Sequence, residues 1–247
     1  MSIRHAVAVS LLAVCLAVPA EAQKRRAVRT IGAPPPVSNQ CHTFGLVSAG
    51  TIGTYVTTTP QGNVNIVITW ISDTPTRTHT TQKVQTPQGA ADVETILDGE
   101  VVGSLRGLRH LLVKTTTQVP VFGSVVTEVE IDFVPSLIAG PAGGWCPDAK
   151  WDVPPVTETI VTRGPAPVPP QIVTTLASSG QVLAVDDVIS VPAGTFHTVK
   201  YRGVVASANG VQTAVTWVSK ERNVVVKQDT LDANGVVTSV TQLVALQ

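Results

Sequence analysis

Residues 191–227 read VPAGTFHTVKYRGVVASANGVQTAVTWVSKERNVVVK, and this stretch decides the fold class. The Pro-Ala-Gly sequence at residues 192–194 predicts a tight turn, because proline presets φ and glycine accepts positive φ. The β-branched and aromatic residues that follow indicate a strand over residues 195–208. Asn209-Gly210 is a strong hairpin signal, since a type I′ turn needs positive φ at both central positions. The stretch therefore predicts consecutive antiparallel strands joined by tight turns.

The return strand of this hairpin is predicted over residues 211–220, and its two faces differ. Side chains alternate across a strand, so one face carries a larger and more apolar set than the other. The larger set is Val211, Thr213, Val215 and Trp217. We therefore expect this face, and Trp217 with it, to lie in the core.

The same stretch resembles a family of uncharacterised secreted bacterial β-proteins. The shared features are the PAGTF turn, a later strand with a tryptophan, here Trp217, then a glycine, a hydrophobic pair and a basic residue, here Lys227. Asn223 stands at the position of that glycine, and asparagine tolerates the left-handed region better than other non-glycine residues. The resemblance implies an envelope protein with an open half-barrel like that of bacterial lipoprotein carriers. It supplies no catalytic residues.

The rest of the mature chain also shows the period of two that strands produce. Apolar and polar residues alternate over residues 63–70 and 125–134, which is typical of antiparallel sheet with one wet face. Residues 90–97 are expected to form a helical turn or short helix, and residues 135–155 a loop. The predicted fold is all-β, with an antiparallel sheet forming a half-barrel or sandwich and little helix.

The beginning of the chain predicts export. A basic start, an apolar run over residues 6–18 and the sequence Ala-Glu-Ala before Gln23 are typical of a secretory signal peptide. We assign residues 1–22 to the signal peptide, residues 23–40 to a flexible basic and proline-rich tail, and residues 41–247 to one β-domain with a proline-rich loop near residues 164–170. A lipoprotein signal at Cys15 is the alternative, although Val14 before it is not small.

Two of the three cysteines remain after the signal peptide, Cys41 and Cys146. An even pair in an exported chain indicates one disulfide between them. Two free thiols or metal ligands are the alternatives, and His42 beside Cys41 suggests the metal interpretation. A zinc site usually has four ligands at close spacings, which this pair does not supply.

Composition excludes several classes of function. The formal net charge is zero and charged residues make up 14% of the chain, so there is no electrostatic footprint for nucleic acid. No apolar stretch after residue 22 approaches the length of a membrane-spanning helix, about 18 residues. The sequence contains no phosphate loop, GxGxxG, HExxH or GxSxG motif. No cofactor is therefore predicted.

The remaining chemistry-bearing residues are interpreted first as structural. Glu128, Glu130 and Asp132 share one strand face and could bind a cation, but a solvated face is the favoured interpretation. Asp186 and Asp187 are adjacent, so in an extended strand they point to opposite faces and do not form an acid–base pair. The mature histidines belong to no recognisable metal motif; they are His42, His79, His110 and His197.

Three hypotheses for function follow. The first is an exported envelope protein, periplasmic or extracellular, that binds a lipid, another apolar ligand or a partner in a β-groove without catalysis. The second is a structural or adhesive β-domain without a ligand cavity. The third is an enzyme such as a hydrolase. The oligomeric state is not indicated by any feature of the sequence.

Overall fold

The computed structural model describes residues 40–87, 89–119, 123–165, 171–207 and 210–247. The predicted signal peptide and the tail up to residue 39 lie outside these residues, as do residues 166–170 of the predicted proline-rich loop and Asn209 of the predicted turn. Every regular element in the described part of the chain is a strand. The strands are β1 (Ile52–Thr59), β2 (Gly62–Asp73), β3 (Arg77–Thr86), β4 (Gly89–Val102), β5 (Leu105–Val119), β6 (Gly123–Pro141), β7 (Lys150–Arg163), β8 (Gln171–Val191), β9 (Gly194–Ser207), β10 (Gly210–Ser219), β11 (Val225–Leu231) and β12 (Val237–Leu246).

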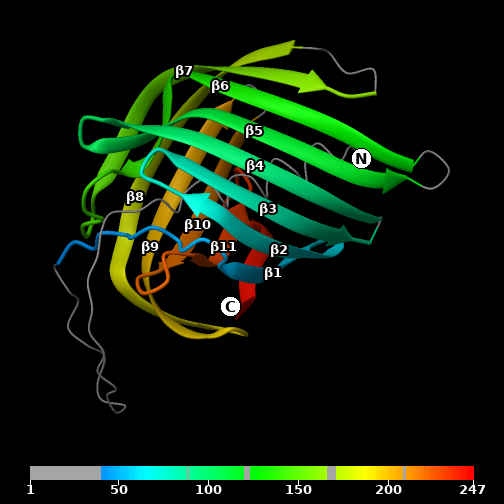
Figure 1. Cartoon of the computed structure of the whole chain (residues 1–247). Helices are drawn as coiled ribbons and strands as arrows, with labels where there is room; N and C mark the ends of the chain where they lie inside the picture. The colour runs from blue at the N-terminus through cyan, green and yellow to red at the C-terminus, as the bar shows by residue number, and fades with distance from the viewer. Residues whose placement is uncertain (1–39, 88, 120–122, 166–170, 208–209) are drawn as a thin grey trace.

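The strands form a closed antiparallel barrel in which each strand pairs with its neighbours in sequence (Figure 1). Pairing of β1 with β12 closes the circle, with Tyr55 opposite Leu243 and Thr57 opposite Thr241. The expected all-β antiparallel fold is confirmed, and its sheet forms a barrel. Closure matters because a sheet that closes on itself leaves no long unpaired edge.

The PAGTF turn and the hairpin after it form as predicted. Val191 pairs with Gly194, whose φ of 132° only glycine adopts readily, so the chain turns over residues 192–193. Strands β9 and β10 pair over their whole length, with Ser207 opposite Gly210. The predicted turn residue Asn209 lies outside the described residues.

Two expectations about local structure are wrong. Residues 90–97 are part of β4, where Val93, Thr95 and Leu97 are buried and alternate with more exposed residues. The burial repeats with a period of two, which is the period of a strand and not of a helix. The segment is a strand because the strands on both sides pair with it. Residues 135–155 are not a loop throughout, since β6 continues to Pro141 and β7 begins at Lys150.

Prolines determine where β6 and β7 separate. The last pair between them is Val134 with Thr157. Pro135 comes directly after Val134, and Pro155 lies two positions before Thr157. Proline has no N–H and cannot donate to a sheet ladder. Beyond this point β6 pairs only with β5 and β7 only with β8.

A cluster of aromatic rings packs at this end of the barrel. Trp145 lies at its centre, with ring centroids 5.5 Å from Phe44, 5.8 Å from Trp151 and 4.9 Å from Tyr201. All four side chains are buried. They are four of the ten Phe, Trp and Tyr residues in the chain, so much of the aromatic packing energy is concentrated here.

The segment before β1, residues 40–51, crosses the same end of the barrel, and we call it the strap. It begins at the β6–β7 loop, where His42 and Trp145 exchange backbone hydrogen bonds of 3.0 and 2.7 Å. Farther along, the Gly45 N–H donates to Asn223 Oδ1 and the Val47 N–H donates to Asp73 Oδ2, both at 2.9 Å. Figure 1 shows the strap in blue, running to β1. Because these contacts lie on three different connections, the strap closes this end.

The disulfide between Cys41 and Cys146 fixes the strap to the β6–β7 loop. It is the pairing that the cysteine count predicts, and the metal interpretation of these cysteines is not supported. Asn223 has a φ of 59°, so it adopts the left-handed conformation expected of a residue at a glycine position. Its side chain also supplies the acceptor for Gly45, which glycine could not do.

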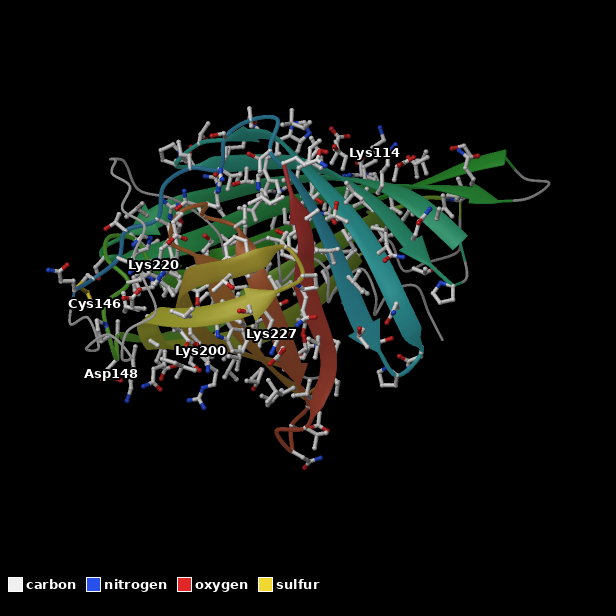
Figure 2. The ribbon with its side chains drawn as sticks, turned by 90° about the horizontal axis from the view of Figure 1, so that it is seen from below. Lys114, Cys146, Asp148, Lys200, Lys220 and Lys227 are labelled. Carbon is white, nitrogen blue, oxygen red and sulfur yellow. A yellow bond between two sulfur atoms is a disulfide. The ribbon has the colours of Figure 1, made fainter. Side chains whose placement is uncertain are left out.

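Trp217 is buried, as expected, with an exposed fraction of 7%, but it points to the outer face, so the expected inward orientation of its set is wrong. It pairs with Lys200 on β9 and Lys227 on β11, and directly opposite residues share a face. The two ammonium groups lie 4.8 and 4.7 Å from the ring centroid, and the indole N–H donates to Asp187 Oδ2 at 2.9 Å. Figure 2 shows both lysines on the same side of the molecule as the β8–β9 hairpin. Trp217 is thus buried on the outer face, by lysine stems and a carboxylate.

Removing the disulfide with the double change Cys41→Ala and Cys146→Ala should destabilise the protein strongly. The bond joins residues 105 positions apart, and on the chain-entropy model a loop of about 100 residues corresponds to a loss of about 4 to 5 kcal/mol in the free energy of unfolding. Urea denaturation of the variant and of the parent measures the difference. Parent protein kept in reductant serves as the control and should shift equally; a shift below about 1 kcal/mol would contradict the assigned constraint.

Two glycines that face each other across β8 and β9 should respond differently to alanine. A Cβ added at Gly180 would lie 2.0 Å from the Trp151 ring, whereas no atom lies within 4 Å of one added at Gly203, its direct partner. Because Trp145 and Tyr201 hold the Trp151 ring, Gly180→Ala should cost about 1 to 3 kcal/mol or more through overpacking. Gly203→Ala should be close to neutral. Equal unfolding midpoints for the two variants would refute this packing.

Candidate functional site

The interior of the barrel is closed at one end and accessible at the other. At the closed end, which carries the strap and the β6–β7 loop, inward side chains such as Val199, Val218 and Leu243 are completely buried. The opposite end carries the β1–β2 and β11–β12 connections among others, and we call it the open end. Inward apolar side chains there, including Val129, Ile131 and Val205, are only partly buried although they pack against the core. Solvent therefore reaches the inner face of the sheet from the open end.

A row of three isoleucines lies on this inner face. Ile131 on β6 pairs with Ile160 on β7, and Ile160 pairs with Ile172 on β8. Ile172 shares the inner face of β8 with Leu176, which is buried in the core. The exposed fraction of Ile172 is nevertheless 41%. This isoleucine row is thus an apolar surface that faces the barrel interior and still contacts water.

The row is accessible because one wall of the barrel is longer than the other. Pairing between β8 and β9 begins at Ala177 with Ala206, so residues 171–176 of β8 extend beyond the last pair. Strand β7 accompanies them, with Ile160 and Val161 opposite Ile172 and Gln171. Figure 1 shows β5, β6 and β7 side by side along this extended wall.

Glu158 is a carboxylate on the same inner face. It lies opposite Phe133 on β6 and Thr174 on β8, and it alternates in register with the buried Val156. Burial raises the pKa of Glu158. Among the described residues we find no hydrogen bond or ion pair to its carboxyl group. A half-buried carboxyl without a partner beside an apolar surface is available to a ligand.

The predicted candidate residues are not brought together at this place. His79 contacts Glu94 at 2.9 Å and His110 contacts Asp132 at 2.8 Å, both on the outer face. His197 lies on the β8–β9 hairpin beside Asp186. His42 lies in the strap, where burial and then the charge of Lys220 lower its pKa.

The acidic residues also take separate partners. Arg163 on β7 holds Glu128 and Glu130 at 2.9 and 2.8 Å. Asp186 contacts Lys220 and His197, whereas Asp187 accepts from the Trp217 indole. Asp186 and Asp187 therefore do not form an acid–base pair, in agreement with their adjacent positions.

Sequence reasoning did not identify Glu158. A signal was present, because Val156, Glu158 and Ile160 form one alternating set in a strand whose other set contains Thr157, Thr159 and Val161. The charged residue thus occurs in the more apolar set. That signal alone does not decide which set faces inward. The pairing of Glu158 with the buried Phe133 decides it, because directly opposite residues share a face.

Comparison with known proteins identifies no activity. No family model and no curated protein matches the sequence. One similar solved structure is a provisionally assigned exported protein with a YmcC-like fold from Bacteroides fragilis, with a TM-score of 0.42 and 11% identity. Another is a provisionally assigned lipoprotein from Parabacteroides distasonis, with a TM-score of 0.31 and 15% identity. Each likeness covers 84% of this chain and 100% of the other.

The described part of the chain contains no helix that is long and apolar enough to cross a membrane.

Replacing Glu158 by glutamine should stabilise the protein at pH 7. The carboxyl group ionises in the unfolded chain at an ordinary pKa of 4.5, and burial raises this pKa in the folded chain. Between these two values the folded state binds more protons than the unfolded state, so its stability falls as the pH rises. Glu158→Gln removes this loss of folding stability. The difference in stability between the variant and the parent should therefore shrink when the pH is lowered to 4.

Thermal unfolding of both proteins at pH 7 and pH 4 measures this effect. Glu128→Gln is the matched control, because Glu128 lies on the outer face in an ion pair with Arg163. A Glu158→Gln variant that melts below the parent at pH 7 would show that the carboxylate has a stabilising partner.

Proposed function

We propose that this protein is exported and binds an amphiphilic ligand, without catalysis, at the open end of the barrel. The apolar part of the ligand lies along the isoleucine row, and its polar head lies beside Glu158. The observation that carries the proposal is the exposed fraction of Ile172, an inward-facing apolar side chain that water still reaches. Covering such a surface with an apolar chain is favourable, by about 25 cal/mol per Å² of area removed from water.

Glu158 specifies the chemistry of the head group. An ammonium or a hydrogen-bond donor compensates the half-buried carboxyl, whereas a second carboxylate beside it would be repelled and desolvated. The ligand class is therefore an amphiphile with a cationic or donor head, such as an aminolipid, rather than a free fatty acid. Thr174, directly opposite Glu158 on β8, offers an additional hydroxyl.

The arrangement of the other polar groups supports binding rather than hydrolysis. General acid–base catalysis needs a second group within hydrogen-bond reach of the reacting atoms. His79 and His110 lie on the outer face, His42 in the strap and His197 on the β8–β9 hairpin. None of these four histidines has a contact with Glu158 that would support such a role.

Export is supported by two independent features. The disulfide between Cys41 and Cys146 is typical of proteins that fold outside the reducing cytosol. The basic and apolar start of the chain, with its Ala-Glu-Ala sequence, is that of a signal peptide. We place the mature protein in the periplasm or outside the cell, with Gln23 as its first residue.

Binding of the fluorescent probe N-phenyl-1-naphthylamine tests the isoleucine row. The parent should bind the probe, and Ile172→Gln should weaken binding about tenfold or more, because burial of an isoleucine contributes about 1.5 to 3 kcal/mol. Val173→Gln is the matched control: Val173 is the next residue on β8, points to the outer face and is 60% exposed. Its binding should be unchanged.

Competition below the micellar concentration tests the head group. Dodecyltrimethylammonium should displace the probe at lower concentration than dodecanoate, and Glu158→Gln should reduce this preference. Native mass spectrometry of protein from its source should show a retained amphiphile. If the parent does not bind the probe, the structural or adhesive β-domain is the better description. If Ile172→Gln and Val173→Gln weaken binding equally, the ligand lies elsewhere.

A further inference from the structure

We infer that His110, Glu130 and Asp132 form a zinc-class metal site on the outer face of β5 and β6. His110 and Asp132 are directly opposite residues of the two strands, and Glu130 lies two positions from Asp132 on the same face. One ligand atom from each of the three residues lies within 4.8 Å of the other two. Among the described residues, the group of three His, Cys, Asp or Glu residues whose ligand atoms lie this close together is His110, Glu130 and Asp132.

The donor set suits a divalent transition metal. Imidazole nitrogen favours zinc, copper, iron or nickel, and two carboxylate oxygens add negative charge to balance the cation. Three protein ligands with water in the fourth position are a common arrangement for zinc. The group therefore does not need the cysteines, which are used in the disulfide.

The present distances require only small movements to hold an ion. His110 Nδ1 and Asp132 Oδ1 are 2.8 Å apart, with a proton between them. Tetrahedral zinc with bonds of about 2.0 to 2.2 Å would separate them by about 3.3 Å. Binding thus exchanges a proton for the metal and widens the pair by about half an ångström. Glu130 already has a ligand oxygen within 4.8 Å of the other two ligand atoms.

Neighbouring charges position these ligands. Arg163 contacts Glu130 through Oε2 at 2.8 Å, which orients the carboxylate and leaves Oε1 as the metal ligand. On the other side of His110 lies Asp98, its direct partner on β4, which contacts Arg77 at 3.2 Å. The cationic groups facing the site are thus Arg163 and Arg77, each bound to a carboxylate.

The chain contains a natural control for this site. His79 and Glu94 form a similar contact of 2.9 Å on the outer face of β3 and β4. Among the residues that the structure describes, that pair has no third ligand at comparable distance. Zinc affinity that comes only from a surface histidine next to a carboxylate should therefore be equal at His79 and at His110. Any higher zinc affinity at His110 comes from the set of three ligands.

Isothermal titration of untagged, EDTA-treated mature protein with zinc chloride at pH 7.5 tests the inference. The parent should bind one zinc ion per chain. His110→Ala and Asp132→Asn should each weaken binding tenfold or more, and His79→Ala should leave it unchanged. A thermal melt without metal checks that each variant is folded, and zinc should raise the melting temperature of the parent and of His79→Ala.

Two results would overturn the site. One is a parent titration without saturable binding, and the other is equal loss in the His79→Ala and His110→Ala variants, which would indicate adventitious surface binding. The test is independent of the proposed function, because the ligands lie on the outer face and the isoleucine row on the inner face. Probe binding should remain when the metal ligands are changed.

Discussion

Everything in this molecule depends on the pairing of the first strand with the last. Eleven hairpin connections, each local in sequence, give a sheet with one apolar face but do not by themselves bury it. When β1 pairs with β12, the two edges disappear and the apolar faces meet around Tyr55 and Leu243. The strap is covalently joined by Cys41 to the β6–β7 loop, and β1 follows it directly. Closure and the strap thus reinforce each other.

Local features of this fold were predictable from the sequence, and long-range ones were not. Turn residues at 192–194 and the alternation over residues 125–134 predict antiparallel strands, because both depend on neighbours in the chain. The closing register and the orientation of Trp217 depend on other strands. Ala214, Thr216 and Val218 are buried on the inner face of β10, where Thr216 lies opposite the fully buried Tyr201 of β9. Trp217 is covered on the outer face by two lysines of the neighbouring strands, which the sequence of its own strand does not predict.

The same division applies to the candidate site. The disulfide could be predicted by counting cysteines, and the hypothesis of a β-groove for an apolar ligand rested on the alternating aliphatic residues, the low charge and the family resemblance. The place of that surface could not be predicted, since it arises where β7 and β8 extend beyond the last β8–β9 pair. Glu158 is significant only because Phe133 and Thr174 flank it, and these partners lie about 25 and 16 positions away in the chain.

The strap also gives the barrel a polarity. It starts at the closed end, beside Cys146 and far around the circle from β1. Any attachment made through the residues that precede Gln40 would therefore hold the molecule by its closed end. The isoleucine row would then lie at the end of the barrel that is away from the point of attachment. The disulfide and the hydrogen bonds of the strap together set where the chain leaves the barrel.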